Sequence, residues 1–153
     1  MKNGVFFSVL KSGESYIKDY KENSDGKKCL EGKSFAFAIR IVNLYKYLSE
    51  QRCEYILSKQ ILRSGTSIGA NFVEGSYAQT RRDFHAKLSI SKKEAGETKY
   101  WLEVLRATDY IDEEQFKSLS KDCEELIRLL FVICKKTERR DQLTKIPMGY
   151  YGD

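Results

Sequence analysis

The sequence predicts an all-α protein, an antiparallel up-down-up-down four-helix bundle. Its only proline is Pro147, near the end of 153 residues, so no earlier segment is interrupted by proline. Four segments carry apolar residues at alternating three- and four-residue spacing, the period of a helix that buries one face. The connections between these segments are short, and short connections join antiparallel neighbours.

Residues 1–33 form an N-terminal leader arm, with enough apolar residues for one short helix. Four glycines fall in it, and Asn23-Ser24-Asp25-Gly26 is a strong turn signal. Its apolar run Val5-Phe6-Phe7 is too short to span a membrane, and no small-residue cleavage site follows it. We assign the arm no function and expect a cytoplasmic protein that makes no membrane contact.

The bundle is predicted over residues 34–137, and Ser34 is a candidate N-cap for its first helix. The buried face of that helix is expected to contain Phe37, Ala38, Ile41, Leu44, Tyr45 and Leu48.

The second helix is expected from about Glu54 to Tyr77, although it contains glycines. Each glycine inside a helix costs about 1 kcal/mol relative to alanine. A break into a loop is the alternative, but the apolar residues keep the helical phase and favour a continuous helix. Gly65 and Gly69 share a face, which would let another helix approach closely.

The third helix is predicted to begin after a capping box of Thr80 and Asp83. Its apolar face alternates by four and three over seven positions: Phe84, Leu88, Ser91, Ala95, Thr98, Leu102 and Leu105. The middle of this face is small or hydroxylated. We therefore expect it to pack closely against another helix, with Gly65 and Gly69 as the candidate partners.

The fourth helix is predicted to begin at Asp112, with Gln115 completing its cap. Acidic residues open this helix and basic residues close it, which suits the helix dipole. Its apolar face is Phe116, Leu119, Cys123, Leu126, Leu130 and Ile133. Residues 138–153 follow as a polar C-terminal tail.

A long motif in the second helix carries a family resemblance. The run from Leu57 to Asn71, followed by Glu74, resembles the signature of the four helix bundle protein family, also called the 23S rRNA intervening-sequence proteins. A second block matches as well, at Asp83-Phe84, Ser89-Ile90, Lys93-Glu94-Ala95, Glu97-Thr98 and Tyr100-Trp101-Leu102. The resemblance covers about residues 34–137.

The resemblance implies a four-helix bundle that assembles into a ring-shaped homopentamer. Some members are encoded inside insertions in bacterial 23S rRNA genes. Relatives serve as accessory proteins of diversity-generating retroelements, where they bind nucleic acid and a reverse transcriptase. The implied partners are therefore further copies of this chain, RNA or DNA, and a reverse transcriptase or other protein. The chain departs from the family in its long leader arm and in Gly75, where many relatives carry alanine.

The placement of positive charge points to an anionic partner. The formal net charge is +5, from 27 basic and 22 acidic side chains. Two basic clusters lie at the start of the third helix and at the end of the fourth, and antiparallel packing would bring them to one end of the bundle. Repeated around a ring, they would form a multivalent phosphate-binding surface. The alternative is a solvated face that only maintains solubility. The candidate nucleic-acid-binding residues are Arg81, Arg82, Lys87, Lys92, Lys93, Lys135, Lys136, Arg139 and Arg140.

A second group of polar, small and aromatic residues occupies the second and third helices. We expect hydrogen bonds and ion pairs between helices or subunits that fix the register of packing. Tyr100 and Trp101 are adjacent, so one can pack in the core while the other faces solvent or a neighbouring subunit. The candidate packing and assembly residues are Arg63, Gly65, Gly69, Asn71, Glu74, Glu94, Glu97, Tyr100 and Trp101.

The chemistry of a catalytic or metal site has no support in the sequence. Di-iron bundles need Glu-x-x-His pairs, and the only histidine, His85, has no glutamate three residues before it. Ser64, Ser67 and Cys123 lack a histidine partner, and no C-x-x-C pair indicates zinc. We expect no cofactor, no metal and four reduced thiols. The leading hypothesis is a non-enzymatic homo-oligomeric scaffold that binds nucleic acid; the alternative is a protein-interaction adaptor without a nucleic-acid role.

Overall fold

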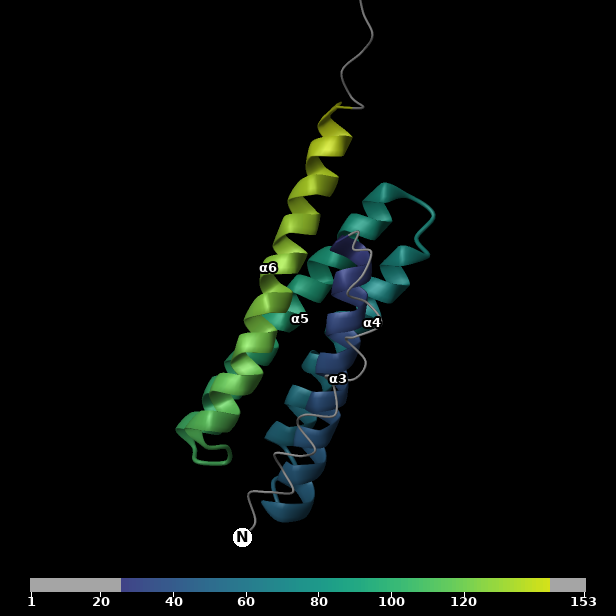
Figure 1. The fold of residues 1–153 in the computed structure, drawn as a ribbon. Helices are drawn as coiled ribbons and strands as arrows, with labels where there is room; N and C mark the ends of the chain where they lie inside the picture. Colours follow the sequence, from purple (N-terminus) through teal and green to yellow (C-terminus); the bar gives the residue numbers. More distant parts are fainter. Residues whose placement is uncertain (1–25, 144–153) are drawn as a thin grey trace, which may run out of the picture.

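The computed structural model describes residues 26–143, with side chains described as far as Arg139. Four helices follow one another in antiparallel order: α3 (Gly26–Gln51), α4 (Leu57–Ser76), α5 (Arg81–Ala107) and α6 (Glu113–Leu143) (Figure 1). Each helix of the chain packs against two others: α3 contacts α4, α4 contacts α5, α5 contacts α6 and α6 contacts α3. The α4–α5 interface is the most extensive of the four and the α3–α6 interface the least. The predicted all-α four-helix bundle is confirmed.

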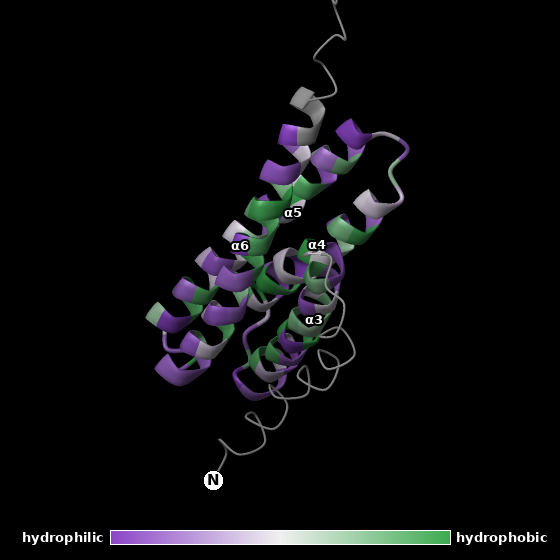
Figure 2. Cartoon of the chain, turned by 45° about the horizontal axis from the view of Figure 1, so that its top comes forward, coloured by the Kyte–Doolittle hydropathy of each residue, from purple (hydrophilic) through white to green (hydrophobic). Residues whose placement is uncertain are grey.

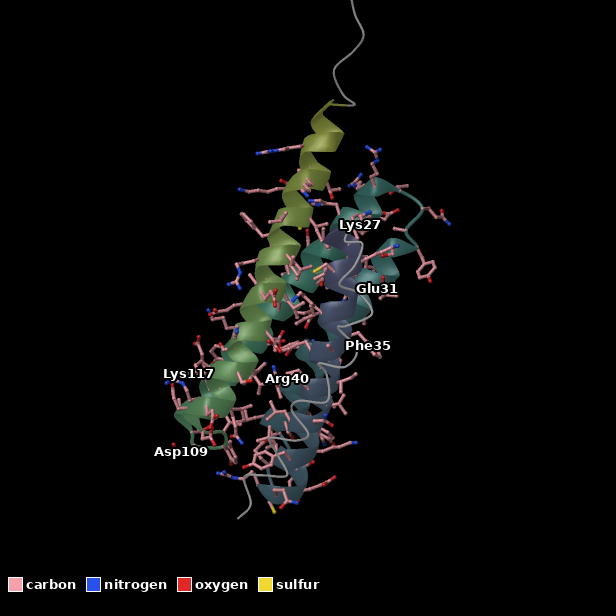
Figure 3. All side chains as sticks on the ribbon, in the orientation of Figure 1. Lys27, Glu31, Phe35, Arg40, Asp109 and Lys117 are labelled. Atoms are coloured by element: carbon pink, nitrogen blue, oxygen red, sulfur yellow. The ribbon has the colours of Figure 1, made fainter. Side chains whose placement is uncertain are left out.

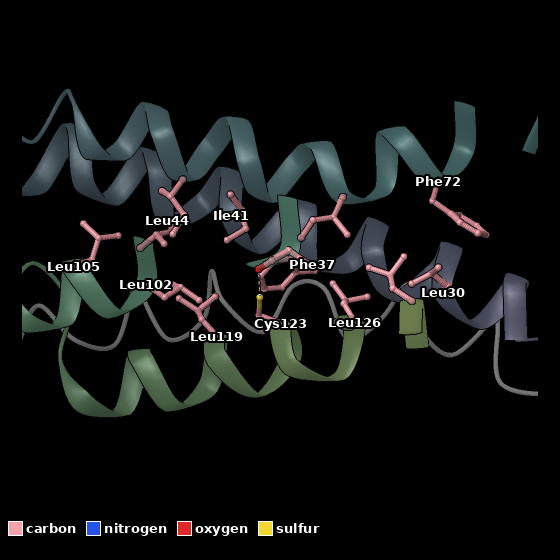
Figure 4. Close-up of a cluster of buried hydrophobic side chains, with 14 of the residues drawn as sticks. Leu30, Phe37, Ile41, Leu44, Phe72, Leu102, Leu105, Leu119, Cys123 and Leu126 are labelled. Atoms are coloured by element: carbon pink, nitrogen blue, oxygen red, sulfur yellow. Dashed lines mark hydrogen bonds between the residues drawn. The ribbon is translucent and has the colours of Figure 1, made fainter. Parts of the chain in front are cut away.

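All four helices contribute to one hydrophobic core. Figure 4 shows part of it, with Phe37 of α3 and Leu102 of α5 facing Leu119 and Cys123 of α6. The face predicted for the third helix is buried from its second position to its last, and the fully buried members are Leu88, Ser91, Ala95, Thr98, Leu102 and Leu105. The period of that face therefore gave the core side of α5 correctly.

The small residues of α4 face a different neighbour from the one predicted. The helix is continuous through its glycines, as expected, but Gly65 and Gly69 face α3. A Cβ built on Gly65 would lie 2.8 Å from Cγ1 of Ile41, and one on Gly69 would lie 3.0 Å from Oγ of Ser34. Their expected packing against the small residues of α5 is therefore wrong.

The residue directly before each of these glycines contacts α5 instead. The Ser91 hydroxyl donates to the Ile68 carbonyl at 2.6 Å, and the Thr98 hydroxyl donates to Ser64 Oγ at 3.0 Å. One residue turns a helix by about 100°, so Ser64 and Ile68 face α5 while the adjacent glycines face α3.

The first and last helices extend beyond their predicted limits. The α3 helix begins at Gly26, so Ser34 is not its N-cap; Ser34 is 1% exposed inside the helix and donates to the Glu31 carbonyl at 3.0 Å. The part of the leader arm at residues 26–33 is thus helical, and its remainder lies outside the described residues. The α6 helix continues to Leu143, so the tail predicted from residue 138 is helical at its start; residues 144–153 lie outside the described part.

Three helix starts are capped by side chains. Thr80 accepts from the Asp83 amide at 3.1 Å, and Asp112 and Gln115 each accept from the other's amide at 2.8 Å, so both predicted caps are confirmed. The cap of α4 was missed. The Glu54 carboxylate accepts from three successive amides, those of Ile56, Leu57 and Ser58, at 2.9, 2.7 and 2.6 Å.

Candidate nucleic-acid interface

The two predicted basic clusters meet at one end of the bundle. This end, where α3 and α5 begin and α4 and α6 finish, is called the basic end below (Figure 1). Arg81 in the first turn of α5 and Lys136 near the end of α6 line the same cavity. Figure 2 shows hydrophilic residues gathered at the start of α5 and toward the end of α6. The antiparallel packing therefore does bring the clusters together, as the sequence predicts.

Two further predicted cations, one on α5 and one on α6, lie beside an exposed aromatic ring. Lys135 of α6 holds its ammonium 4.5 Å from the centroid of the Phe131 ring, and Lys92 of α5 approaches the same ring at 6.0 Å. Phe131 itself is 48% exposed. Arrangements of exposed rings and cations suit single-stranded nucleic acid, because a base can stack on the ring while the cations contact phosphates.

The remaining predicted cations are divided between the basic end and the sides of the bundle. Arg82 and Arg139 are exposed at the basic end, whereas Arg140 lies on α6 with its side chain outside the described part. Lys93 is exposed about three turns along α5. Lys87 does not join the clusters, since it forms a 2.7 Å ion pair with Glu74 of α4.

Glu138 is an acidic side chain within this basic region. Glu138 Oε1 is 3.1 Å from Nε2 of His85, which joins the second turn of α5 to the end of α6. His85 is half-buried. This contact ties together the two helices that carry the basic clusters.

The predicted packing residues form interhelical contacts between α4 and α5. Arg63 pairs with Glu97 and lies 3.6 Å from Glu94, and Trp101 Nε1 donates to Glu97 at 3.2 Å. The hydrogen bonds from Arg63 and Trp101 hold the pKa of Glu97 below its ordinary value. Tyr100 is 58% exposed and packs edge-on against Trp101, with ring centroids 5.1 Å apart. Ion pairs therefore join α4 to α5, and Trp101 packs against the core while its neighbour Tyr100 is exposed.

Asn71 has a local role in α4. Its side-chain amide donates to the Ser67 carbonyl one turn earlier, at 2.8 Å. It makes this contact within its own helix, unlike Arg63 and Glu74, which reach across to α5.

One cation at the basic end was missed by the sequence reasoning. Lys27 lies in the first turn of α3 and lines the cavity that Arg81 and Lys136 also line (Figure 3). The sequence predicts residues 1–33 as a leader arm outside the bundle, and this leaves Lys27 out of the basic clusters. A signal was present, because Leu30 and Ser34 continue the apolar face of α3 toward its start at the same four-and-three spacing.

The cysteines, the possible metal ligands and the apolar character of the helices bear on whether the described residues form a disulfide, a metal site or a membrane span. All four cysteines, Cys29, Cys53, Cys123 and Cys134, are free thiols. Within residues 26–143, no three histidine, cysteine or acidic side chains are grouped as metal ligands would be. No helix in that range combines the length and the apolar character needed to cross a membrane.

Comparisons with known proteins identify the family. The family model described as 23S rRNA-intervening sequence protein matches residues 30–132. The chain belongs to that family. It is also 53% identical to a protein of unknown function from the S23 ribosomal protein family of Bacteroides thetaiotaomicron VPI-5482, whose crystal structure superposes with a TM-score of 0.71 and covers 72% of this chain and 98% of that one. A search of curated proteins returned no match.

The limits of the family match divide the basic end. Arg81 and Arg82 fall inside the segment matched to the 23S rRNA-intervening sequence protein family. Lys27, Lys135 and Lys136 fall outside it. The basic end therefore combines positions from the matched part of the chain with positions that lie beyond it.

Proposed function

We propose that this chain is a non-enzymatic, homo-oligomeric helical scaffold that binds RNA or DNA through its basic end. The observation that carries the proposal is the convergence of Arg81 and Lys136, which are 55 residues apart in sequence, on one cavity. Arg82, Lys135 and Arg139 are exposed beside them. Cations clustered in this way attract phosphates and release counterions, without reading base sequence.

Assembly into a ring would strengthen this interaction. The family resemblance implies a homopentamer, in which the basic end would be repeated around the ring. Each contact would be weak, but several on one particle act together through a high effective concentration. The four free thiols suit the reducing cytoplasm, where such a scaffold would meet nucleic acid.

A binding assay with a salt series tests the proposal. Labelled single- and double-stranded RNA and DNA are titrated with the full-length protein, while light scattering gives the mass of the particle. We expect affinity to fall steeply with salt, because each neutralised phosphate contributes a slope of about −0.7 to −0.9 in log affinity against log salt. Replacing Arg81, Arg82, Lys135 and Lys136 by glutamine should reduce both the affinity and this slope.

The matched control removes four positive charges at the opposite end of the bundle. Lys46, Lys59, Lys117 and Lys121 are exposed near the end of α3 and the starts of α4 and α6, and Figure 3 shows Lys117 there. Their replacement by glutamine changes the net charge equally, so the affinity should fall much less. Equal losses in the two variants would mean that net charge alone drives binding, and absence of binding at low salt would exclude the nucleic-acid function.

A second candidate function is a protein-interaction adaptor, which exposed apolar side chains favour. Tyr77, directly after α4, is 85% exposed, Val73 of α4 is 40% exposed, and Tyr100 of α5 is 58% exposed. Exposed aromatic and aliphatic residues of this kind suit the centre of a protein interface. Further copies of the chain, a reverse transcriptase or another protein would occupy such a face. An intact oligomer that ignores nucleic acid but retains a protein partner in a pull-down would support this function.

A further inference from the structure

Phe131 of α6 is a large apolar ring that the fold leaves open to solvent. Its neighbours Leu130, Ile133 and Cys134 are buried in the core, whereas Phe131 is 48% exposed. Lys92 of α5 approaches the same ring, so Phe131 lies where the surfaces of α5 and α6 meet. The ring is therefore accessible to a molecule that binds along this pair of helices.

Two ammonium groups lie beside the ring without an acidic partner among the described side chains. Lys135 follows Phe131 by one helical turn and holds its ammonium 4.5 Å from the ring centroid, and Lys92 holds its own at 6.0 Å. Neither lysine forms an ion pair with a carboxylate of the described part of the chain. Glu138, the acid nearest to Lys135 in sequence, contacts His85 at 3.1 Å instead. Phe131, Lys92 and Lys135 are called the Phe131 cluster below.

The surface of α5 next to the Phe131 cluster is open. Gly96, one turn after Lys92, is exposed, and nothing lies within 4 Å of a Cβ built there. The next lysine on this side of α5, Lys99, is held by an ion pair with Glu124 of α6 at 3.0 Å. A planar group bound beside the ring therefore meets no side chain at position 96.

We infer that the Phe131 cluster is a stacking site for an unpaired nucleic-acid base, with Lys92 and Lys135 contacting the phosphates next to that base. Every base has a flat face that can stack on an aromatic ring, but in a duplex this face is covered by the neighbouring bases, so the site selects single strands. Stacking of a base contributes more than a solvent-exposed cation–π contact, so a base can displace an ammonium from the ring toward a phosphate. The inference rests on the proposed function and adds to it the class of strand that is bound.

Two strands of equal charge separate the contribution of the base from that of the phosphate. One is a labelled oligothymidine, and the other is its abasic counterpart, which has the same number of phosphates and no bases. Fluorescence anisotropy measures the affinity of the full-length protein for each strand. We expect the oligothymidine to bind about tenfold more tightly than the abasic strand, as the stacking of one base would give.

Phe131→Ala removes the ring, and Val132→Ala is its matched control. Val132 is the next residue of α6 and is also 48% exposed, but it has no aromatic ring. Phe131→Ala should weaken binding of the oligothymidine about tenfold and leave binding of the abasic strand and of a DNA duplex almost unchanged. Phe131→Trp should keep the preference for the oligothymidine, because its larger ring also stacks. Val132→Ala should bind every strand as the unmodified protein does.

Lys92→Gln/Lys135→Gln removes the two charges and keeps the ring. This variant should weaken binding of the oligothymidine and of the abasic strand alike. Its slope of log affinity against log salt should be shallower by up to about 1.4, because each phosphate contact on a single strand contributes about 0.7. Circular dichroism establishes that all four variants are folded.

The failure of the proposed function and the failure of this inference give different results. If neither strand binds at low salt, the nucleic-acid function is wrong and the stacking site falls with it. If the unmodified protein binds both strands equally, or if Phe131→Ala weakens both equally, the nucleic-acid function stands and the ring does not stack on bases. An equal loss in Val132→Ala and Phe131→Ala would also overturn the inference, because exposed apolar surface in general would then explain the effect.

Discussion

Gly65 sets how closely α4 approaches α3. A Cβ at this position would lie 2.8 and 2.9 Å from the two Cγ atoms of Ile41, which is fully buried. Alanine has the better helix propensity by about 1 kcal/mol, but overpacking in a close-packed core costs about 1–3 kcal/mol. We expect Gly65→Ala to lower the free energy of unfolding, measured by urea denaturation.

Gly96 of α5 provides the matched control for Gly65. It is exposed, and nothing lies within 4 Å of a Cβ built there. Gly96→Ala should therefore raise the free energy of unfolding by up to about 1 kcal/mol through helix propensity alone. If both alanine variants gained stability, Ile41 would be free to move aside and the close approach at Gly65 would not limit the packing.

The four cysteines should differ sharply in reactivity. Cys123 is fully buried, and burial raises the pKa of its thiol to about 12, an effect that nearby Lys99 only partly offsets. Burial also raises the pKa of Cys134, whereas Cys53 is exposed. Because the thiolate is the reactive form, an aromatic disulfide reagent at pH 8 should modify Cys53 first and should reach Cys123 and Cys134 only after denaturation. Rapid modification of all four thiols in the native protein would contradict the buried core.

At the scale of the element, the start of α4 depends on Glu54. Burial raises the pKa of this carboxyl, but hydrogen bonds from three successive backbone amides together lower it by more than burial raises it. The pKa of Glu54 is therefore below its ordinary value of 4.5. A group with a lowered pKa in the folded state adds stability above pH 4.5, which is lost as the pH falls through its folded-state pKa. We expect Glu54→Gln to cost about 1–2 kcal/mol at pH 7.

The pH dependence distinguishes this cap from a general loss of stability. Protonated glutamate resembles glutamine, so the difference in unfolding free energy between the unmodified protein and Glu54→Gln should shrink as the pH is lowered from 7 to 3. Urea denaturation at several pH values measures it. A difference that stays constant over this range would show that the charge of Glu54 does not contribute to the cap.

Helix type and core faces were predictable from the sequence, whereas some helix limits and neighbours were not. The face of α5 repeats by four and three without interruption, so its buried side followed directly. A serine before an apolar run is a frequent N-cap, which is why the sequence predicts a cap at Ser34, yet its small side chain lies in close contact with Gly69. Glu54 was missed because glutamate is not among the favoured capping residues. Spacing defines a buried face but does not say which helix lies against it.

At the scale of the whole molecule, the basic end was only partly predictable. Antiparallel order placed the start of α5 beside the end of α6, and this brought Arg81 and Lys136 together as expected. The third cation, Lys27, required the true start of α3 to be known. Which cations turn toward a shared cavity and which contact a partner, as Lys87 contacts Glu74, depends on side-chain packing that spacing does not determine.

The α3–α6 interface closes the bundle, and it contains a guanidinium that is almost fully buried. Arg40 of α3, 9% exposed, pairs with Asp122 and donates to Ser118 Oγ at 2.7 Å (Figure 3). A second ion pair joins Lys33 and Glu125 at 2.8 Å. Burying a guanidinium is costly, and the Nε atom of Arg40 has no hydrogen-bond partner among the described residues. The pairing with Asp122 offsets part of that cost.

Removing the two partners of this ion pair should therefore have unequal effects. Asp122→Ala leaves the buried charge of Arg40 without its counter-ion and should cost about 1–3 kcal/mol, less than for a fully buried pair because Asp122 is partly exposed. Arg40→Met keeps an aliphatic chain in the interface and removes the buried charge, so its cost should stay below about 1 kcal/mol. Urea denaturation of both variants and of the double variant measures the difference. A larger loss for Arg40→Met than for Asp122→Ala would mean that attraction within the pair, and not relief of a buried charge, holds α3 against α6.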